Sequence, residues 1–224
     1  MTRSWRYLAA EEAGFTGAET APDQGWVAQM RPLVTELSQP GDVVLDPFAG
    51  WGTTLVACAA EGRRGVGLEI SEARVAAARR RLARCPQATP QVMVCADSRT
   101  PPLRDGTADL CLTNLPYFGG GMEADSSTDG QLYTRLDYAE YLSEVDRVFA
   151  ALRRVVRPGG YLVVAAENLR LSSGFVPQAW DVARLLGRHF TLGDERILCY
   201  DKKSRSSDPL MSNRAHEYLL VAQR

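Results

Sequence analysis

Asp46-Pro47-Phe48-Ala49-Gly50-Trp51-Gly52-Thr53-Thr54 is the stretch of sequence that decides the fold. It follows a short apolar run, 43–45, that is typical of a buried strand, and it leads into a segment of helical length, 53–61. Gly50 and Gly52 let the backbone turn sharply and let a ligand lie close to it. The stretch therefore predicts a strand, a tight turn and a helix whose free N–H groups and positive end face a ligand.

Strands and helices alternate on both sides of this turn. Apolar residues at helical spacing predict a first helix at 26–37, and Pro40-Gly41 ends it. Further helices are expected at 72–84, 138–156 and 178–186, and further strands at 65–68, 92–95, 108–112, 161–166, 191–200 and 215–222. No helix separates the last two strands, so these should pair as a hairpin. The sequence predicts an α/β, Rossmann-like, mostly parallel seven-stranded sheet with a C-terminal antiparallel hairpin.

The chain divides into two parts by its pattern. Residues 1–25 have no clear period and contain Gly, Ala and Pro, so we expect an N-terminal extension or a lid. Residues 26–224 should form one domain, because a chain of 224 residues suits a single large domain. The long segment 118–137 is rich in Gly, Ser, Thr and Asp, and irregular segments of that size inside a compact domain are usually functional.

Composition excludes several classes of protein. The net charge of -1 lacks the positive excess expected of a protein that grips duplex DNA over a long footprint. With 5 cysteines, no CxxC pair and only 2 histidines, we expect neither a disulfide framework nor a metal site. Cys58, Cys95 and Cys111 lie in apolar runs and are predicted to be core residues of a reduced, cytoplasmic protein. No segment reaches the roughly 18 apolar residues that a membrane span needs, so no membrane contact is expected.

Polar or acidic residues stand where four of the expected strands end. They are Asp46, Glu69, Asp97 and Asn114. Ligands of open α/β sheets bind beyond the carboxyl ends of the strands. The four residues therefore mark the expected binding edge of the sheet.

The loop after the first strand distinguishes between two cofactors. A nicotinamide dinucleotide enzyme would carry GxGxxG here, but Leu55 stands where the third glycine would be. Asp46 precedes the glycines, and a carboxylate there disfavours a pyrophosphate but favours a sulfonium and an ammonium group. The string predicts S-adenosylmethionine rather than NAD.

The string DPFAGWGTT resembles the cofactor loop of the class I methyltransferases, and more narrowly that of the amino-group DNA methyltransferases, which typically reads DPFxGxGTT. The resemblance implies that 26–224 is a methyltransferase domain. It also implies that Glu69 accepts hydrogen bonds from both ribose hydroxyls, each worth about 1.5–3 kcal/mol. Ile70 would lie against the adenine ring, and Asp97 or Ser98 would meet its amino edge, although Asp97 could simply cap a turn. The implied cofactor-binding residues are Asp46, Pro47, Phe48, Gly50, Gly52, Thr53, Thr54, Glu69, Ile70, Asp97 and Ser98.

Asn114-Leu115-Pro116-Tyr117 resembles the Asn/Asp/Ser-Pro-Pro-Tyr motif of methyltransferases that act on amino nitrogens. Leu in second place is similar to the ribosomal RNA adenine dimethyltransferases. The oxygen of the Asn114 side chain and a backbone carbonyl at Leu115 or Pro116 would hold the two hydrogens of the amino group, so that alignment supplies most of the acceleration. Tyr117 offers a ring face to a planar substrate. The implied catalytic residues are Asn114, Pro116 and Tyr117.

Charge distribution bears on the acceptor. The stretch 202–220 is similar to the last hairpin of amino-group DNA methyltransferases. The residues expected to contact the substrate are Lys202 and Arg205 from this stretch, together with Leu115, Tyr117 and Phe118. His216 and Glu217 are interpreted as plain hairpin residues. The 118–137 segment is acidic, which does not suit a polyanion groove, and no separate target-recognition region is present between 26 and 224.

Three functions follow from these patterns. The first is an S-adenosylmethionine-dependent N-methyltransferase that acts on an amino group of a nucleobase-like substrate in RNA or DNA. The second is an N-methyltransferase for a small-molecule amine or a protein side chain. The third is a cofactor-binding subunit without activity, which the intact Asn114-Leu115-Pro116-Tyr117 disfavours.

Overall fold

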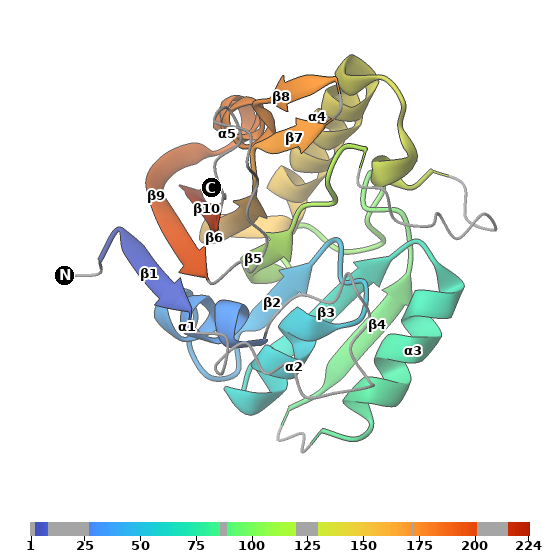
Figure 1. Cartoon of the computed structure of the whole chain (residues 1–224). Helices are drawn as coiled ribbons and strands as arrows, with labels where there is room; N and C mark the ends of the chain where they lie inside the picture. Colours follow the sequence, from blue (N-terminus) through green and yellow to red (C-terminus); the bar gives the residue numbers. More distant parts are fainter. Residues whose placement is uncertain (1–2, 9–26, 86–88, 120–129, 172, 201–214) are drawn as a thin grey trace.

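The computed structural model describes residues 3–8, 27–85, 89–119, 130–171, 173–200 and 215–224. One large sheet lies between two layers of helices (Figure 1). The strands of this sheet are β1 (Trp5–Leu8), β2 (Val43–Asp46), β3 (Arg64–Glu69), β4 (Gln91–Cys95), β5 (Ala108–Asn114), β6 (Val156–Ala166), β9 (Thr191–Tyr200) and β10 (His216–Gln223). The helices are α1 (Val27–Leu37), α2 (Thr53–Ala60), α3 (Glu72–Leu82), α4 (Tyr138–Val155) and α5 (Gln178–His189), with a 3-10 turn η2 (Leu132–Thr134) and a small hairpin of β7 (Leu169–Leu171) and β8 (Gly174–Val176).

The strand order of the sheet is β1-β9-β10-β6-β5-β2-β3-β4. The five adjacent strands β6, β5, β2, β3 and β4 are mutually parallel, whereas β10 is antiparallel to both β6 and β9. The predicted mostly parallel sheet with a C-terminal antiparallel hairpin is thus confirmed. The chain runs outward from β2 through β3 to β4, and β5 then pairs with the other side of β2. This reversal opens a crevice beyond the carboxyl ends of β2 and β5.

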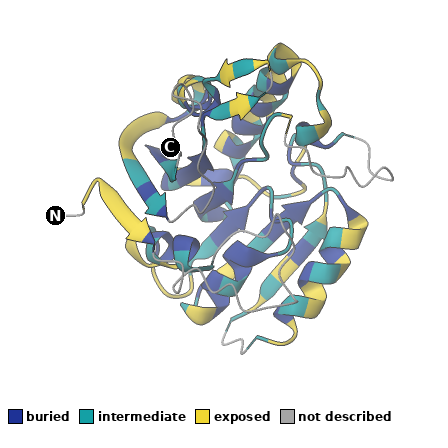
Figure 2. Ribbon diagram, viewed as in Figure 1, coloured by how far each residue is buried: buried dark blue, intermediate teal, exposed yellow. Residues whose placement is uncertain are grey.

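Both faces of the sheet are buried, as expected for a parallel sheet covered by helices. On β5, Leu110 and Leu112 belong to the core that contains Met30 and Val34 of α1. Cys111, between them, points to the opposite face and joins the core around α4 and α5. Figure 2 shows the resulting buried centre of the molecule. The period of two along the strand therefore divides the core into two layers.

Three features differ from the sequence-based expectations. β1, which lies within segment 1–25, pairs in parallel with β9 and makes the sheet eight-stranded, whereas the sequence predicted seven strands. β6 begins at Val156 and includes Pro158-Gly159-Gly160, because Gly159 N–H donates to Arg224 O (2.9 Å) and Gly160 O accepts from Arg224 N–H (3.0 Å). Cys58 and Cys111 are buried as expected, but Cys95 is exposed, since it ends the edge strand β4.

Neither a helix able to cross a membrane nor a metal-binding cluster occurs among the described residues. None of their helices combines the length and the apolar character that a membrane crossing needs. They contain no group of three or more His, Cys, Asp or Glu side chains arranged to hold a metal ion.

Candidate active site

Asp46 is the last residue of β2, where the strand order of the sheet reverses, and is 3% exposed. Its Oδ1 accepts hydrogen bonds from the Phe48 backbone N–H (3.0 Å) and the Thr113 hydroxyl (2.7 Å), and its Oδ2 accepts one from the Thr54 hydroxyl (2.6 Å). Burial raises the pKa of Asp46 to about 6, although the three donors oppose the rise. The carboxylate therefore fastens the loop, α2 and β5 to one another.

Glu69, at the end of β3, holds the same loop from the other side. Its Oε2 accepts a hydrogen bond from the Gly50 N–H (3.0 Å), and its Oε1 accepts one from the Ser71 N–H (2.9 Å). Burial raises the pKa of this side chain, and the backbone donors oppose the rise. The Ile70 backbone N–H is a third donor to this carboxylate. Since a carboxylate has roughly four acceptor positions, Glu69 can still accept a further hydrogen bond.

Glycines let the loop approach its neighbours closely. Gly50 and Gly52 have φ values of 48° and 75°, which L side chains rarely adopt. No sequence pattern predicts a role for Gly67 on β3, but a Cβ there would lie 2.7 Å from the Ala49 Cβ and 2.6 Å from the Met93 Sδ. The loop is therefore packed directly against β3, and Gly67 leaves the room for it.

Residues after β4 support the site in ways that the sequence did not reveal. The Ser98 hydroxyl donates to the Pro47 carbonyl, so it holds the loop. Arg99 donates to both oxygens of Asp97 (2.9 and 2.6 Å) and pairs with Glu144 of α4. Burial raises the pKa of Asp97, but the hydrogen bonds and charge of Arg99 outweigh burial and leave that pKa below its ordinary value. Asp97 is thus kept ionised at the edge of the crevice.

Asn114, at the end of β5, is oriented by a side chain from α1. Gln29 is 4% exposed, and its Nε2 donates to the Asn114 Oδ1 (3.2 Å) and to the Glu217 Oε2 (2.5 Å). Glu217 was expected to be a plain hairpin residue, but its position on β10 places it inside this network. The sequence signal for Gln29 is a polar residue on the buried side of a helix, next to Met30 and among Leu33 and Val34.

The residues after Asn114 are fixed through their backbone. Leu115 is 2% exposed and packs in the core, so only its backbone could reach a substrate. The Pro116 carbonyl accepts a hydrogen bond from the Tyr141 hydroxyl (2.8 Å), which leaves the Leu115 carbonyl as the favoured second acceptor for an amino group. Tyr117 is partly buried, and burial, followed by the charges of Glu217 and Glu167, raises its pKa.

Phe118 connects the motif to α4 and α5. Its N–H donates to the Gln178 Oε1 (2.8 Å), and its ring lies 5.1 Å from the ring of Tyr138 and 5.7 Å from that of Tyr141. The predicted substrate contact by Phe118 therefore lies at the junction between the site and these two helices.

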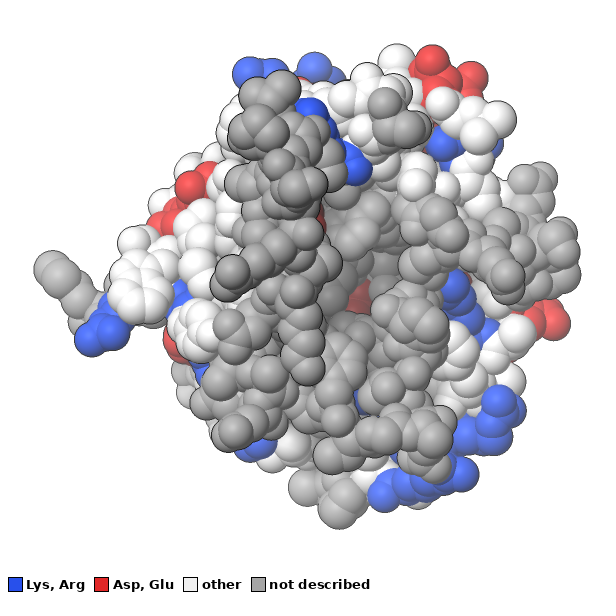
Figure 3. Space-filling model, in the orientation of Figure 1, with Lys and Arg blue, Asp and Glu red and all other residues white. Residues whose placement is uncertain are grey.

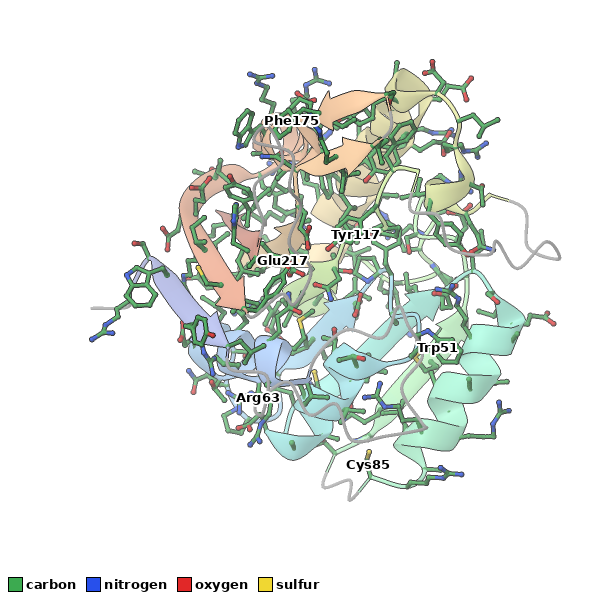
Figure 4. The ribbon with its side chains drawn as sticks, in the orientation of Figure 1. Trp51, Arg63, Cys85, Tyr117, Phe175 and Glu217 are labelled. Atoms are coloured by element: carbon green, nitrogen blue, oxygen red, sulfur yellow. The ribbon has the colours of Figure 1, made fainter. Side chains whose placement is uncertain are left out.

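The predicted cofactor loop and the predicted acceptor motif, the two half-sites, meet where the strand order of the sheet reverses, beyond the ends of β2 and β5. Figure 3 shows the molecular surface hollowed there, with acidic atoms inside the hollow, and Figure 4 shows Tyr117 and Glu217 near the centre of the molecule. Ile70 is partly buried at the end of β3. Lys202 and Arg205 lie outside the described residues. The residues that the described structure gathers around the loop and the ends of β2, β3, β4 and β5 are Asp46, Pro47, Phe48, Gly50, Gly52, Thr53, Thr54, Glu69, Ile70, Asp97, Ser98, Asn114, Leu115, Pro116, Tyr117 and Phe118.

Sequence comparisons give partial matches. The sequence model of a family described as DNA methylase matches residues 17–80. The protein YubD of Escherichia coli (strain K12) is 38% identical over 77 residues, which are 34% of this chain and 34% of the relative. The DNA adenine methyltransferase YhdJ of the same organism is 41% identical over 64 residues, 29% of this chain and 22% of the relative. The matched part thus spans about a third or less of the length of these curated relatives.

Comparison with solved structures covers nearly the whole chain. An S-adenosylmethionine-dependent methyltransferase from Methanosarcina mazei gives a TM-score of 0.58 at 13% identity, over 86% of this chain and 97% of the other. Geranyl diphosphate methyltransferase, solved in complex with S-adenosylmethionine, gives 0.57 at 17% identity, over 92% and 94%. The chain therefore has the fold of the S-adenosylmethionine-dependent methyltransferases. The expected resemblance to the class I methyltransferases is confirmed, and the matches support S-adenosylmethionine as the cofactor.

Proposed function

We propose that the chain is an S-adenosylmethionine-dependent N-methyltransferase whose acceptor is an amino group of a nucleobase-like substrate in RNA or DNA. The observation that carries the proposal is the hydrogen bond between Thr113 and Asp46 (2.7 Å), which joins the cofactor loop to the strand that ends in Asn114. It is supported by the match of residues 17–80 to the DNA methylase family.

The residues around the loop fit S-adenosylmethionine. Glu69 receives three backbone hydrogen bonds and keeps an acceptor position for a ribose hydroxyl. Gly50 and Gly52 leave the loop without side chains that would cover the ligand. The negative charge of Asp46 favours the sulfonium and ammonium groups. When bound, this cofactor supplies a sulfonium methyl group, whose C–S bond breaks as the new N–C bond forms.

Asn114 would make the acceptor nitrogen a better nucleophile. The lone pair of an exocyclic amino group is delocalised into its ring, which weakens the nitrogen as a nucleophile. The Asn114 Oδ1 and the Leu115 carbonyl would accept its two hydrogens and aim the lone pair at the methyl group. The proton leaves to water after transfer, so no strong base is required. In duplex DNA the base would first have to be flipped out of the stack.

A second candidate acceptor is a basic amine of a small molecule or a protein side chain. The observation in its favour is the pair of carboxylates, Glu167 and Glu217, whose charges both raise the pKa of Tyr117. Carboxylates near an acceptor site attract a cation and repel a phosphate.

Two measurements test the proposed function. S-adenosylmethionine should raise the melting temperature and NAD should not, and the opposite pattern would exclude the assigned cofactor. With radiolabelled cofactor and pooled RNA, DNA and metabolite fractions, the wild type should label one fraction. The Asn114→Ala variant should lose at least about 100-fold of this activity but keep the cofactor-induced rise in melting temperature. Equal turnover by the variant would remove Asn114 from the mechanism.

A further inference from the structure

An exposed aromatic pair lies on the β7–β8 hairpin and α5. Phe175 and Trp180 are 47% and 49% exposed, and their ring centroids are 5.8 Å apart at an interplanar angle of 54°. Single exposed aromatic residues are common, but a contiguous exposed apolar surface usually marks a binding site.

The register of the hairpin directs Phe175 outward. Arg170 and Phe175 are directly paired across β7 and β8, so their side chains stand on the same face, and both are exposed. Leu169 and Leu171 alternate with Arg170 along β7 and are partly buried. The alternation of apolar and polar residues thus presents an arginine beside the aromatic pair.

Two more arginines extend this surface along α5. Arg184 and Arg188 follow Trp180 by four and eight residues, which places them on the same side of the helix. Arg184 pairs with Asp181 (3.0 Å) and Arg188 with Asp146 (3.7 Å). The arginine side chains are 78% and 64% exposed, whereas those of the aspartates are 21% and 32% exposed. The positive groups are therefore outermost, and Figure 3 shows arginine side chains (blue) over this part of the molecule.

The surface is attached directly to the acceptor motif. Gln178, the first residue of α5, accepts the hydrogen bond from the Phe118 N–H (2.8 Å). A Cβ on Gly119 would lie 3.4 Å from the Leu171 Cδ1 of β7, so the chain after the motif packs on the hairpin. Figure 4 shows Phe175 on the hairpin beyond Tyr117. A ligand that reaches past the acceptor motif on this side would meet the aromatic pair.

We propose that this aromatic–arginine surface, formed by Arg170, Phe175, Trp180, Arg184 and Arg188, binds single-stranded nucleic acid next to the acceptor nucleotide. Bases stack on the two rings and phosphates lie near the arginines, a combination that binds single strands irrespective of sequence. Three outermost arginines fit a polyanion better than they fit an apolar protein partner. The proposal rests on the proposed function, whose nucleobase acceptor it places in a strand.

The test measures the binding of short fluorescent oligonucleotides by polarisation. Single-stranded RNA, single-stranded DNA and duplex DNA are compared, because stacking requires unpaired bases but does not choose between RNA and DNA. Trp180→Ala and Phe175→Ala should each weaken single-strand binding at least about fivefold. Arg184→Gln should weaken it less at high salt than at low salt. Both aromatic residues are exposed, so the variants should melt near the wild-type temperature.

Trp5→Ala is the matched control. Trp5 is 53% exposed with the Arg3 guanidinium 5.9 Å from its ring centroid, but it lies on β1, an edge strand of the sheet, and not on the β7–β8 hairpin or α5. This variant should bind oligonucleotides like the wild type.

Unchanged oligonucleotide affinity in both Trp180→Ala and Phe175→Ala would overturn the proposal. So would sedimentation showing that the wild type self-associates and that Trp180→Ala does not, because the surface would then bind a second copy of the chain. Stabilisation of the wild type by S-adenosylmethionine is measured in parallel. If that stabilisation persists while the variants bind normally, only the surface assignment fails. If it is absent, the proposed function fails.

Discussion

The Asp46→Asn variant tests whether burial or hydrogen bonding dominates at the centre of the site. The carboxyl is 3% exposed, and its pKa rises from 3.8 to about 6 on folding, with burial as the largest cause. At 1.36 kcal/mol per pKa unit, keeping Asp46 ionised costs the folded state about 3 kcal/mol. Asparagine has nearly the same shape and no charge, so it should remove most of this cost. For a chain of this size, the melting temperature should rise by about 6–12 °C near neutral pH.

The pH dependence of the effect has a definite sign. An acid whose folded pKa lies above its unfolded pKa binds its proton more tightly when folded. The wild type should therefore lose stability as the pH rises from about 4 to about 6, and this loss is complete above about 6. The melting temperatures of the variant and the wild type should differ most near pH 8, by about half as much at pH 5, and hardly at all below about pH 4. Thermal melts across this range measure the difference directly.

Melts with S-adenosylmethionine add a second readout. The variant should show a smaller cofactor-induced rise, because it lacks the negative charge that favours the sulfonium. Asp109→Asn is the control, since Asp109 accepts hydrogen bonds from the Val43 N–H (2.9 Å) and from Arg157 (2.6 Å) at the other end of β5. It should lower the melting temperature or leave it unchanged. A lower melting temperature for Asp46→Asn at every pH would refute the reasoning, since the hydrogen bonds would then outweigh burial.

Two other substitutions probe the supports of the site. Gln29→Ala removes the donor to Asn114 Oδ1 and should lower kcat about tenfold, with little change in the KM for the cofactor. An unchanged kcat would show that Asn114 does not need Gln29 to hold its side chain in position. Gly67→Ala would place a Cβ 2.7 Å from that of Ala49 and should lower both the melting temperature and the affinity for the cofactor. The control is Gly187→Ala, in a helix with open space around it, which should stabilise the folded protein by up to about 1 kcal/mol. Equal melting temperatures for the two alanine variants would contradict the close packing of the loop on β3.

Sequence patterns predicted the elements whose signals are local. The strand at β2, the turn and α2 lie within one short string, and α3 begins next to Ser71, whose side chain caps the helix by accepting a hydrogen bond from Arg74 N–H. β1 gave no signal, because it has only four residues and three of them are exposed. The β7–β8 hairpin has three residues in each strand, which is too short for a period to emerge.

The cofactor half of the site was easier to predict than the acceptor half for a physical reason. The loop residues that bind one another are close in sequence: Phe48 and Thr54 both donate to Asp46. By contrast, Gln29 is separated from Asn114 by 85 residues and from Glu217 by 188 residues. No spacing rule relates residues so far apart, so only the fold reveals that α1 and β10 support the acceptor motif.

The junction of β2 and β5 sets the relative position of the two half-sites. Thr113 donates to Asp46 and is followed directly by Asn114, so a single hydrogen bond separates the loop from the acceptor motif. Thr113 is completely buried, and the pairing of Leu45 with Cys111 fixes the register of the two strands. Methyl transfer from a sulfonium to an amino group depends mainly on how the two reacting atoms are aligned. On this structure, that alignment is a property of the strand junction, because neither the loop nor the Asn114 motif could maintain it alone.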